Sequence, residues 1–513
     1  MGKYEKPRSG GKFKKIVTTC LLCTVLLIAL VCFFAARWYV SVYGRIGFDS
    51  VLYTLTASLG GLQSDLVISF LKGAGVPALV WWLILSFALF FPWKKLGIAW
   101  KWFPLRRVIA CVLALVLSLG LLIHAAFNVE LVDYIFYMLS KTELYNDEYR
   151  DPDTVQITFP AEKRNLIYIM LESMETSYMA NSDGGALSYS LIPELEQIAR
   201  DNINFSHNTN VGGFREVSGA SWTIGSMVSH TAGVPLKVPD GIDDWQNGYG
   251  KDGVFLPGLT SINNILAENG YNQALMVGSD ANFGGRETYY STHGVDDIYD
   301  IYTARKDGIV RPGYFVWWGM EDLHLFDYAK EKITEMSQQD APFAFTMLTV
   351  DTHHIGGYKC ELCGNDHEEN YENVIACSSR QVAAFLEWIQ QQDFYENTTV
   401  IITGDHCSMD KGYFNRNVAP DYIRHVYNCF INSAVEPVRT TNRQFSAIDM
   451  FPSTLAAMGC TIEGNRLGLG VNLFSGEPTL MERVGYAAFN AELAKKSEYY
   501  SEHFYTAEAE PLP

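Results

Sequence analysis

Residues 398–407 read TTVIITGDHC, and this stretch decides the fold class of the chain. Its β-branched run is typical of a buried strand, and Asp405 and His406 follow where that strand would end. A second strand-like run, NLIYIML at 165–171, lies far upstream and is followed by Glu172. The carboxyl ends of parallel strands meet at one edge of a sheet, where α/β enzymes place catalytic and metal-binding groups. Two carboxylates and an imidazole at that edge predict a site for one divalent cation.

Strand-like and helix-like runs alternate around these two segments. We expect strands at 166–171, 274–277, 343–350 and 400–403, and helices at 193–200, 259–269, 378–392 and 446–458. This alternation predicts an α/β/α domain with a mostly parallel central sheet. Residues 161–476 are long enough to bury the core of such a domain. Residues 477–513 are expected to form a C-terminal tail, which is loose from residue 491 onward.

Three apolar stretches dominate the first quarter of the chain. Residues 16–36, 76–93 and 108–127 carry no Asp, Glu, Lys or Arg and are long enough to cross the hydrocarbon core of a bilayer. We therefore expect a membrane domain with three transmembrane helices over 1–127 and a juxtamembrane connector over 128–160. Residues 51–70 could form a fourth span, but Gln63, Asp65 and the glycines of that stretch favour an interfacial segment.

The distribution of Lys and Arg sets the expected orientation. Basic residues crowd the segment before the first span and the loop between the second and third spans, whereas the loop between the first two has only Arg45 and Lys72. Basic segments stay in the cytoplasm, so three crossings place the large domain outside. Residues 1–127 hold 14 basic and 3 acidic residues, and the remainder holds 25 basic and 54 acidic ones. A domain with this excess of acidic residues repels nucleic acid. It would need a bound cation to attract a phosphate.

A Gly/Ser-rich segment, VSGASWTIGSMV at 217–228, is expected to run from a loop into a helix. The free amides at a helix start favour an anion, and a hydroxyl that touches a cation there becomes a usable nucleophile. Thr223 is the candidate for that role. The alternative is structural, because Ser and Thr often cap the first turn of a helix.

Two further segments offer groups that suit a phosphorylated substrate. The strand-like run that ends at Val350 is followed by Asp351, Thr352, His353 and His354, and the two imidazoles could bind metal, contact a phosphate or act in proton transfer. The glycine-flanked loop NFGGRE at 282–287 presents Arg286. Arginine suits phosphate recognition, although a surface pair between Arg286 and Glu287 is the simpler explanation.

Three cysteines, Cys360, Cys363 and Cys377, cluster in a polar stretch of the sequence. The spacing of Cys360 and Cys363 is compatible with zinc, but no second Cys pair follows at a useful distance. Outside the membrane we instead expect a disulfide from Cys377 to Cys360 or Cys363. The third cysteine then has no assigned role.

Four of these motifs, taken in order and at comparable spacing, resemble the membrane phosphoglycerol transferases. These motifs are the strand leading to Glu172, the SWTI sequence at 221–224, the TVDTHH sequence at 349–354 and the GDH sequence at 404–406. The group includes the lipoteichoic acid synthases and belongs to the alkaline phosphatase/sulfatase superfamily. The resemblance covers roughly residues 160–475, and residues 49–56 also resemble an inter-span loop of the glucan-modifying branch.

The resemblance implies a site and a reaction. Glu172, Thr223, Asp405 and His406 match the family's single-metal site, which holds Mn²⁺ or Zn²⁺, and Thr223 matches its nucleophile. His353, beside His354, matches a residue near the donor head group, and Arg286 matches a phosphate-binding arginine. The implied donor is phosphatidylglycerol, the implied acceptor is a glycan, a glycolipid or polyglycerolphosphate, and diacylglycerol is released. The implied location is the bacterial cell membrane, with several spans and an extracytoplasmic catalytic domain.

Two alternatives to this function remain open. Phosphoethanolamine transferases of the same superfamily share the metal set and differ in the donor head group. A catalytically inactive envelope scaffold could keep the fold, although it would have no reason to hold all four site residues. A true sulfatase is disfavoured because it needs a Cys or Ser in a Cys/Ser-x-Pro-x-Arg run, and the nearest run, Cys377 to Arg380, has no proline.

Overall fold

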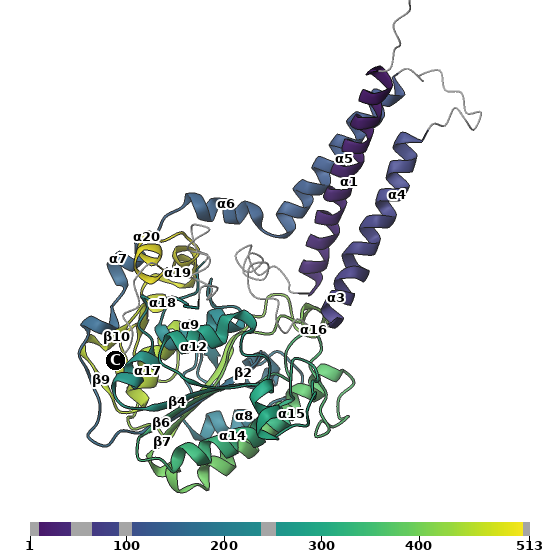
Figure 1. The fold of residues 1–513 in the computed structure, drawn as a ribbon. Coiled ribbons are helices and arrows are strands. Elements are labelled where there is room, and N and C mark those ends of the chain that lie inside the picture. Colours follow the sequence, from purple (N-terminus) through teal and green to yellow (C-terminus); the bar gives the residue numbers. More distant parts are fainter. Residues whose placement is uncertain (1–9, 43–63, 92–104, 238–252, 506–513) are drawn as a thin grey trace, which may run out of the picture. The chain divides into compact units, whose positions relative to one another are not determined.

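The computed structural model describes residues 10–42, 64–91, 105–237 and 253–505 (Figure 1). They belong to two compact units. One unit holds the N-terminal helices up to Ile135, and the other holds the chain from Phe136 onward.

Three helices of the first unit are long and apolar enough to cross a membrane, over Phe13–Val42, Val67–Phe90 and Arg106–Asn128. The first lies in α1 (Gly10–Val42) and the last is α5 (Arg106–Asn128). The middle one joins α3 (Ser64–Phe70), a π-helical turn (Leu71–Gly75) and α4 (Val76–Phe90). The prediction of three apolar helices is confirmed.

The middle helix starts earlier than the sequence suggested. Its candidate span begins at Val67 rather than at residue 76. The Trp38 indole N–H of α1 donates a hydrogen bond to Ser69 Oγ at 3.0 Å, so Ser69, a polar residue of α3, is held against a neighbouring helix. Of the stretch once considered as a fourth span, residues 51–63 lie outside the described residues. Residues 64–70 belong to the middle helix.

The second unit is built on a seven-stranded sheet with the order β3-β8-β7-β2-β6-β4-β5. Its five parallel strands are β2 (Asn165–Leu171), β4 (Asn272–Val277), β5 (Asp297–Tyr299), β6 (Phe343–Leu348) and β7 (Thr398–Gly404). The last two, β8 (Val426–Ile431) and β3 (Gly213–Phe214), add antiparallel to the edge beside β7. The four expected strands are therefore present, and the prediction of a mostly parallel sheet is confirmed.

Helices cover both faces of this sheet, which makes the domain a three-layer α/β/α structure (Figure 1). Successive residues of a strand point to opposite faces, and β2 shows the result. Tyr168 and Met170 join one buried cluster, whereas Ile167 and Ile169 join the other. The first face carries α9 (Thr223–Ala232), α12 (Arg286–Thr292) and α17 (Met450–Ala457). The second carries α8 (Pro193–Asp201), α14 (Asp322–Ser337) and α15 (Asn370–Gln390).

The expected helices are present with shifted bounds. The helix expected at 259–269 is α11 (Ile262–Glu268), which Ser261 caps by accepting a hydrogen bond from the Asn263 backbone N–H. The helix expected from 378 begins eight residues earlier, at Asn370. The remaining elements are α6 (Leu131–Leu139), α7 (Leu144–Glu148), β1 (Ile157–Thr158), α13 (Ile301–Asp307), α16 (Lys411–Asn417), β9 (Thr461–Ile462), β10 (Arg466–Leu467), β11 (Gly470–Val471), α18 (Leu480–Val484), α19 (Tyr486–Leu493) and α20 (Glu498–Tyr500).

The segment from 491 to 505 is not loose, which corrects the expectation for this part of the tail. Tyr500, Phe504 and Tyr505 are buried in the core of the α/β domain. The Tyr500 ring meets the Tyr145 ring edge-on at 5.6 Å. The Thr142 backbone N–H donates to the Lys496 carbonyl at 2.9 Å, so this segment is held against the chain that follows α6. Residues 506–513 lie outside the described residues.

Candidate metal centre

Two adjacent strands deliver the central groups of the candidate site. β2 and β7 run parallel in a register that pairs Leu171 with Gly404, so the next residues, Glu172 and Asp405, emerge side by side. The Asp405 backbone N–H continues the ladder by donating to the Leu171 carbonyl at 3.1 Å. The sequence prediction that these strand ends meet is therefore confirmed.

Glu172, Asp405 and His406 bring one ligand atom each within 4.8 Å of one another. His406 Nε2 lies 3.3 Å from Asp405 Oδ2 and 3.7 Å from Glu172 Oε1. All three side chains are buried. Carboxylate oxygens and an imidazole nitrogen in this arrangement suit Mn²⁺ or Zn²⁺, so the donor set fits a divalent metal.

The hydrogen bonds around the cluster leave the atoms that face its centre available. Asp405 Oδ1 accepts from the backbone N–H groups of Ser173 and His406 at 2.8 and 2.7 Å. Asp405 Oδ2, also buried, has no hydrogen-bond partner among the described residues. His406 Nδ1 lies 3.0 Å from the Cys407 carbonyl, which can only accept. Nδ1 therefore carries a hydrogen, and Nε2 is the nitrogen that can bind a cation once its own proton is displaced.

The electrostatics of the cluster favour a cation. Burial, reinforced by Glu172, raises the pKa of Asp405 to about 7. Burial opposes charge on His406, but Asp405, Glu172 and Glu216 outweigh it and raise the pKa of His406 to about 9. Buried carboxylates that lie this close repel one another. A divalent cation at the centre relieves that repulsion by taking the place of protons.

Thr223 lies at the edge of this cluster. It is the first residue of α9, and its Oγ1 lies 3.4 Å from His406 Nε2. Trp222 occupies the N-cap position, and no side-chain capping hydrogen bond is formed there. Thr223 therefore does not cap the helix, and its side chain is partly exposed beside three buried ligand atoms.

The two histidines after β6 differ in exposure. His353 is partly exposed, its Nδ1 lies 2.7 Å from the His354 carbonyl, and burial lowers its pKa. Glu172 acts on the same imidazole electrostatically, which places His353 beside the metal cluster. The His354 ring is buried and stacks on His353 at 4.4 Å between centroids. A substrate-binding role for either residue stays a prediction.

Arg286 is buried at the start of α12. Its Nη2 donates to Ser279 Oγ at 3.0 Å and to the Asp280 carbonyl at 2.6 Å. The surface pair with Glu287 is therefore not what holds this arginine. Arg286 acts electrostatically on His353, so it belongs to the same end of the sheet, and phosphate binding by it stays a prediction.

Sequence reasoning missed several residues that shape the site. Ser173 adopts a φ of 56°, a left-handed conformation that non-glycine residues seldom take, and its Oγ donates to Glu172 Oε1 at 2.7 Å. Glu216 accepts from the Cys407 backbone N–H at 2.7 Å and so fixes the turn after His406. Trp318 packs against the His353 ring at 4.6 Å. No local sequence signal marks Glu216 and Trp318, because each acts across a long-range contact.

A largely buried ion pair also stabilises the turn after His406. Arg424 contacts Glu175 through both Nε and Nη2, and it also donates to the Ser408 carbonyl at 2.7 Å. Glu175 in turn accepts from the Ser408 backbone N–H at 2.9 Å. The backbone that carries Asp405 and His406 is thus held on both sides.

Comparison with known proteins places the chain in a family. A family model described as Sulfatase matches residues 164–460. Phosphoglycerol transferase I of Xanthomonas campestris pv. campestris (strain B100) is 29% identical over 297 residues, which are 56% of this chain and 40% of the relative. Phosphoglycerol transferase I of Escherichia fergusonii is 29% identical over 383 residues, which are 71% of this chain and 45% of the relative. The chain thus covers less than half the length of these curated relatives.

A solved structure supports the fold. The integral membrane protein lipooligosaccharide phosphoethanolamine transferase A (EptA) from Neisseria meningitidis aligns over 86% of this chain and 84% of its own, with a TM-score of 0.51 and 13% sequence identity. The Sulfatase match spans more than half of the chain and contains β2 and β7, the strands that lead to Glu172 and Asp405. This protein therefore belongs to the Sulfatase family, and its α/β domain has the alkaline-phosphatase/sulfatase-like fold.

Proposed function

We propose that this protein is a membrane-anchored, metal-dependent transferase that moves phosphoglycerol from phosphatidylglycerol to a glycan, glycolipid or polyglycerolphosphate acceptor. One observation carries the proposal. A partly exposed hydroxyl, that of Thr223, lies 3.4 Å from His406 Nε2 in a buried Glu-Asp-His cluster. The relatives named phosphoglycerol transferase I support the choice of phosphoglycerol as the transferred group.

Glu172, Asp405, His406 and Thr223 would hold one Mn²⁺ or Zn²⁺. When bound, the cation lowers the pKa of a hydroxyl that it touches and offsets charge on phosphoryl oxygens. Thr223 is the first residue of α9, and the backbone amides at a helix start favour an anion. Arg286, which acts electrostatically on His353, adds positive charge at this end of the sheet.

The proposed transfer of phosphoglycerol has two steps. In the first, the Thr223 hydroxyl loses its proton and its oxygen bonds to the phosphorus of the donor. The bond from phosphorus to the diacylglycerol oxygen breaks, and that oxygen takes up a proton. In the second, an acceptor hydroxyl bonds to the phosphorus and loses its proton, the bond to Thr223 breaks, and Thr223 recovers a proton. His353, whose Nδ1 is occupied by the His354 carbonyl, would use its Nε2 to contact the head group or the leaving oxygen.

Incubation of the purified protein with phosphatidylglycerol and Mn²⁺ tests the donor and the nucleophile together. We expect diacylglycerol release and an adduct of about 154 Da, one phosphoglycerol unit, on the peptide that contains Thr223. Thr223→Ala should abolish both, whereas Thr223→Ser should keep a slower reaction because it keeps the hydroxyl. Turnover of phosphatidylethanolamine instead, with an adduct of about 123 Da, would identify a phosphoethanolamine transferase. Failure with both lipids would favour the inactive scaffold.

The same proposal places the protein in the bacterial cell membrane with its catalytic domain outside. The Lys and Arg distribution around the apolar helices supports this orientation. Phosphatidylglycerol of the outer leaflet would then lie beside the domain. A C-terminal alkaline phosphatase fusion should be active in intact cells, and a matching green fluorescent protein fusion should be dark. The reverse pattern would place the domain inside.

A further inference from the structure

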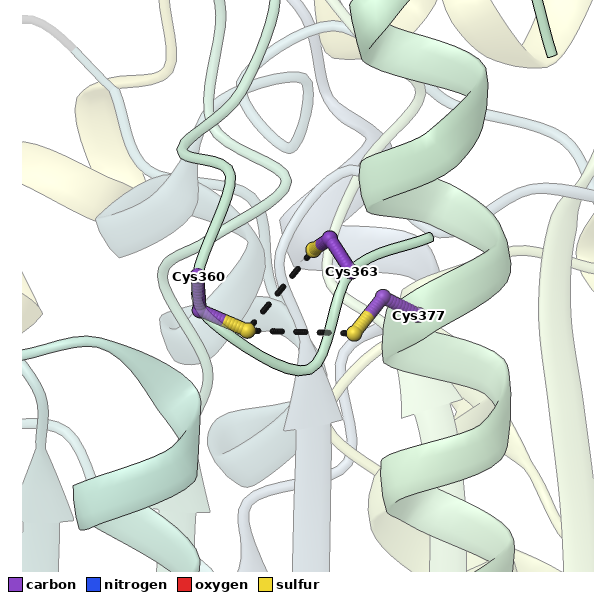
Figure 2. A group of neighbouring side chains, drawn as sticks. All are labelled: Cys360, Cys363 and Cys377. Atoms are coloured by element: carbon purple, nitrogen blue, oxygen red, sulfur yellow. Dashed lines mark hydrogen bonds between the residues drawn. The ribbon is translucent and has the colours of Figure 1, made fainter. Parts of the chain in front are cut away.

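Three cysteines outside the candidate metal centre converge on one point (Figure 2). Cys360 and Cys363 lie in the loop after β6, and Cys377 lies in α15. All three are free thiols, so the structure does not form the disulfide that the sequence suggested. A disulfide would use two of them and leave the third without a role.

The separations between the sulfurs match a metal site. Cys360 Sγ lies 3.6 Å from Cys363 Sγ and 3.8 Å from Cys377 Sγ, and all three sulfurs lie within 4.8 Å of one another. Zinc–sulfur bonds of about 2.3 Å place two ligands of a tetrahedral site about 3.8 Å apart. A disulfide would need about 2.05 Å. Two of the three separations therefore match the edge of a tetrahedral zinc site, and the third pair of sulfurs lies within 4.8 Å.

Hydrogen-bond donors surround the sulfurs. Gln381, one turn along α15 from Cys377, directs its Nε2 to Cys377 Sγ at 3.4 Å and to Cys360 Sγ at 3.9 Å. The Leu362 backbone N–H donates to Cys360, and the Cys363 backbone N–H donates to the Cys360 carbonyl at 3.2 Å. This turn places Cys360 and Cys363 on the same side. Hydrogen-bond donors around ligand sulfurs fix and stabilise them in metal sites.

We propose that Cys360, Cys363 and Cys377 bind one thiophilic divalent cation, Zn²⁺, at a structural site separate from the Glu-Asp-His cluster. Binding forms three zinc–sulfur bonds and releases the three thiol protons to solvent. Among the described residues, no fourth His, Cys, Asp or Glu completes the set, so a water takes the fourth position. Cys363 is partly exposed, which leaves room for that water.

The proposed site connects the loop after β6 to α15. Residues 349–369 connect β6 to α15 without a helix or strand, and they begin with the segment that carries His353 and His354. Two ligands lie in this loop and one lies in α15. The bound cation therefore holds the position of the loop that carries the two histidines.

X-ray absorption at the zinc edge, on the full-length protein purified in detergent with Zn²⁺, tests the proposal without any variant. We expect a sulfur shell at about 2.3 Å, which the Glu-Asp-His cluster cannot produce because its ligands are oxygen and nitrogen at about 2.0–2.2 Å. The Asp405→Asn variant should keep the sulfur shell. Cys363→Ser and Cys377→Ser should lose it, and the matched Cys460→Ser variant, at a buried cysteine outside the cluster, should retain it.

Two results would overturn the proposal. Absence of a sulfur shell, with all three cysteines alkylated under non-reducing conditions, would leave three ordinary thiols. A peptide mass lower by two hydrogens, with one cysteine alkylated, would establish the disulfide. In the expected case, zinc removal with a chelator should speed protease cleavage within residues 355–369 at least tenfold, and Zn²⁺ should restore protection.

Discussion

Gly404 touches the backbone of Met174 so closely that a Cβ at position 404 would lie 2.0 Å from the Met174 carbonyl oxygen. The strand that delivers Asp405 and His406 therefore passes the turn after Glu172 with no space between them. Only glycine fits at this position, so the close approach of the β7 end to the turn after Glu172 depends on it.

Gly404→Ala should separate these two segments. We expect a loss of about 3 kcal/mol or more in the free energy of unfolding, because a backbone atom must move, together with loss of transferase activity. The matched control is Gly412→Ala in α16, where the new Cβ meets only the ends of the Arg416 and Asp410 side chains at 3.3 Å. Thermal unfolding of both variants measures the difference. Equal melting temperatures would contradict the prediction.

Asp405→Asn should remove a metal ligand without removing the fold. The Asn oxygen can still accept from the Ser173 and His406 backbone N–H groups, but the charged Oδ2 is lost. We expect Mn²⁺ affinity to fall about 100-fold or more. Asp449→Asn is the control, since Asp449 also accepts two backbone N–H groups at 3.0 Å but lies outside the ligand cluster. Titration calorimetry should show unchanged binding in that variant, and a similar loss in both would refute the assignment.

Metal affinity should fall as the pH falls. The pKa values of Asp405 and His406 are raised to about 7 and about 9, so both groups hold protons at low pH, and a cation must displace them. Between pH 9 and 7 one proton is displaced, and the apparent Kd for Mn²⁺ should rise about tenfold per pH unit. Below pH 7 the dependence should steepen toward two protons. Calorimetry in buffers of different ionisation enthalpy counts the protons released, and a pH-independent Kd would rule out this set of ligands.

Breaking the Glu175–Arg424 pair should cost far more stability than breaking a surface pair. Glu175 is fully buried, and Arg424 is partly exposed. Glu175→Gln leaves a mostly buried guanidinium poorly compensated and should lower the free energy of unfolding by about 2–3 kcal/mol. Glu369→Gln removes the exposed pair with Arg416 and should cost under about 1 kcal/mol. Chemical unfolding curves of the two variants decide the point, and comparable losses would show that burial does not matter here.

The sequence was sufficient to predict the strands that build the site. β2 and β7 are runs of mostly apolar and β-branched residues, and each is followed directly by an acidic residue. Three apolar helices followed from hydropathy alone. The antiparallel strand β8, from Val426 to Ile431, was not among the expected strands.

The sequence did not predict the conformation of residues that depend on distant partners. Ser173 takes its left-handed conformation because the Glu172 turn must reach Asp405, more than two hundred residues away. In the sequence, the aromatic residues from 499 to 505 resemble part of a polar tail. Only their packing against Tyr145 and Tyr149 shows that they belong to the core. Local pattern gives no information on such contacts, because the side chains that satisfy them are fixed only by the complete fold.

The contact between Thr142 and Lys496 has a consequence for biosynthesis. The segment just after α6 is among the first of the α/β domain to be made, and its partners, including Tyr500 and Phe504, are among the last described. The core cannot close until those residues have left the ribosome. Closure of this core therefore follows synthesis of residues 500–505, and a nascent chain stopped near residue 476 carries an open, unfinished face.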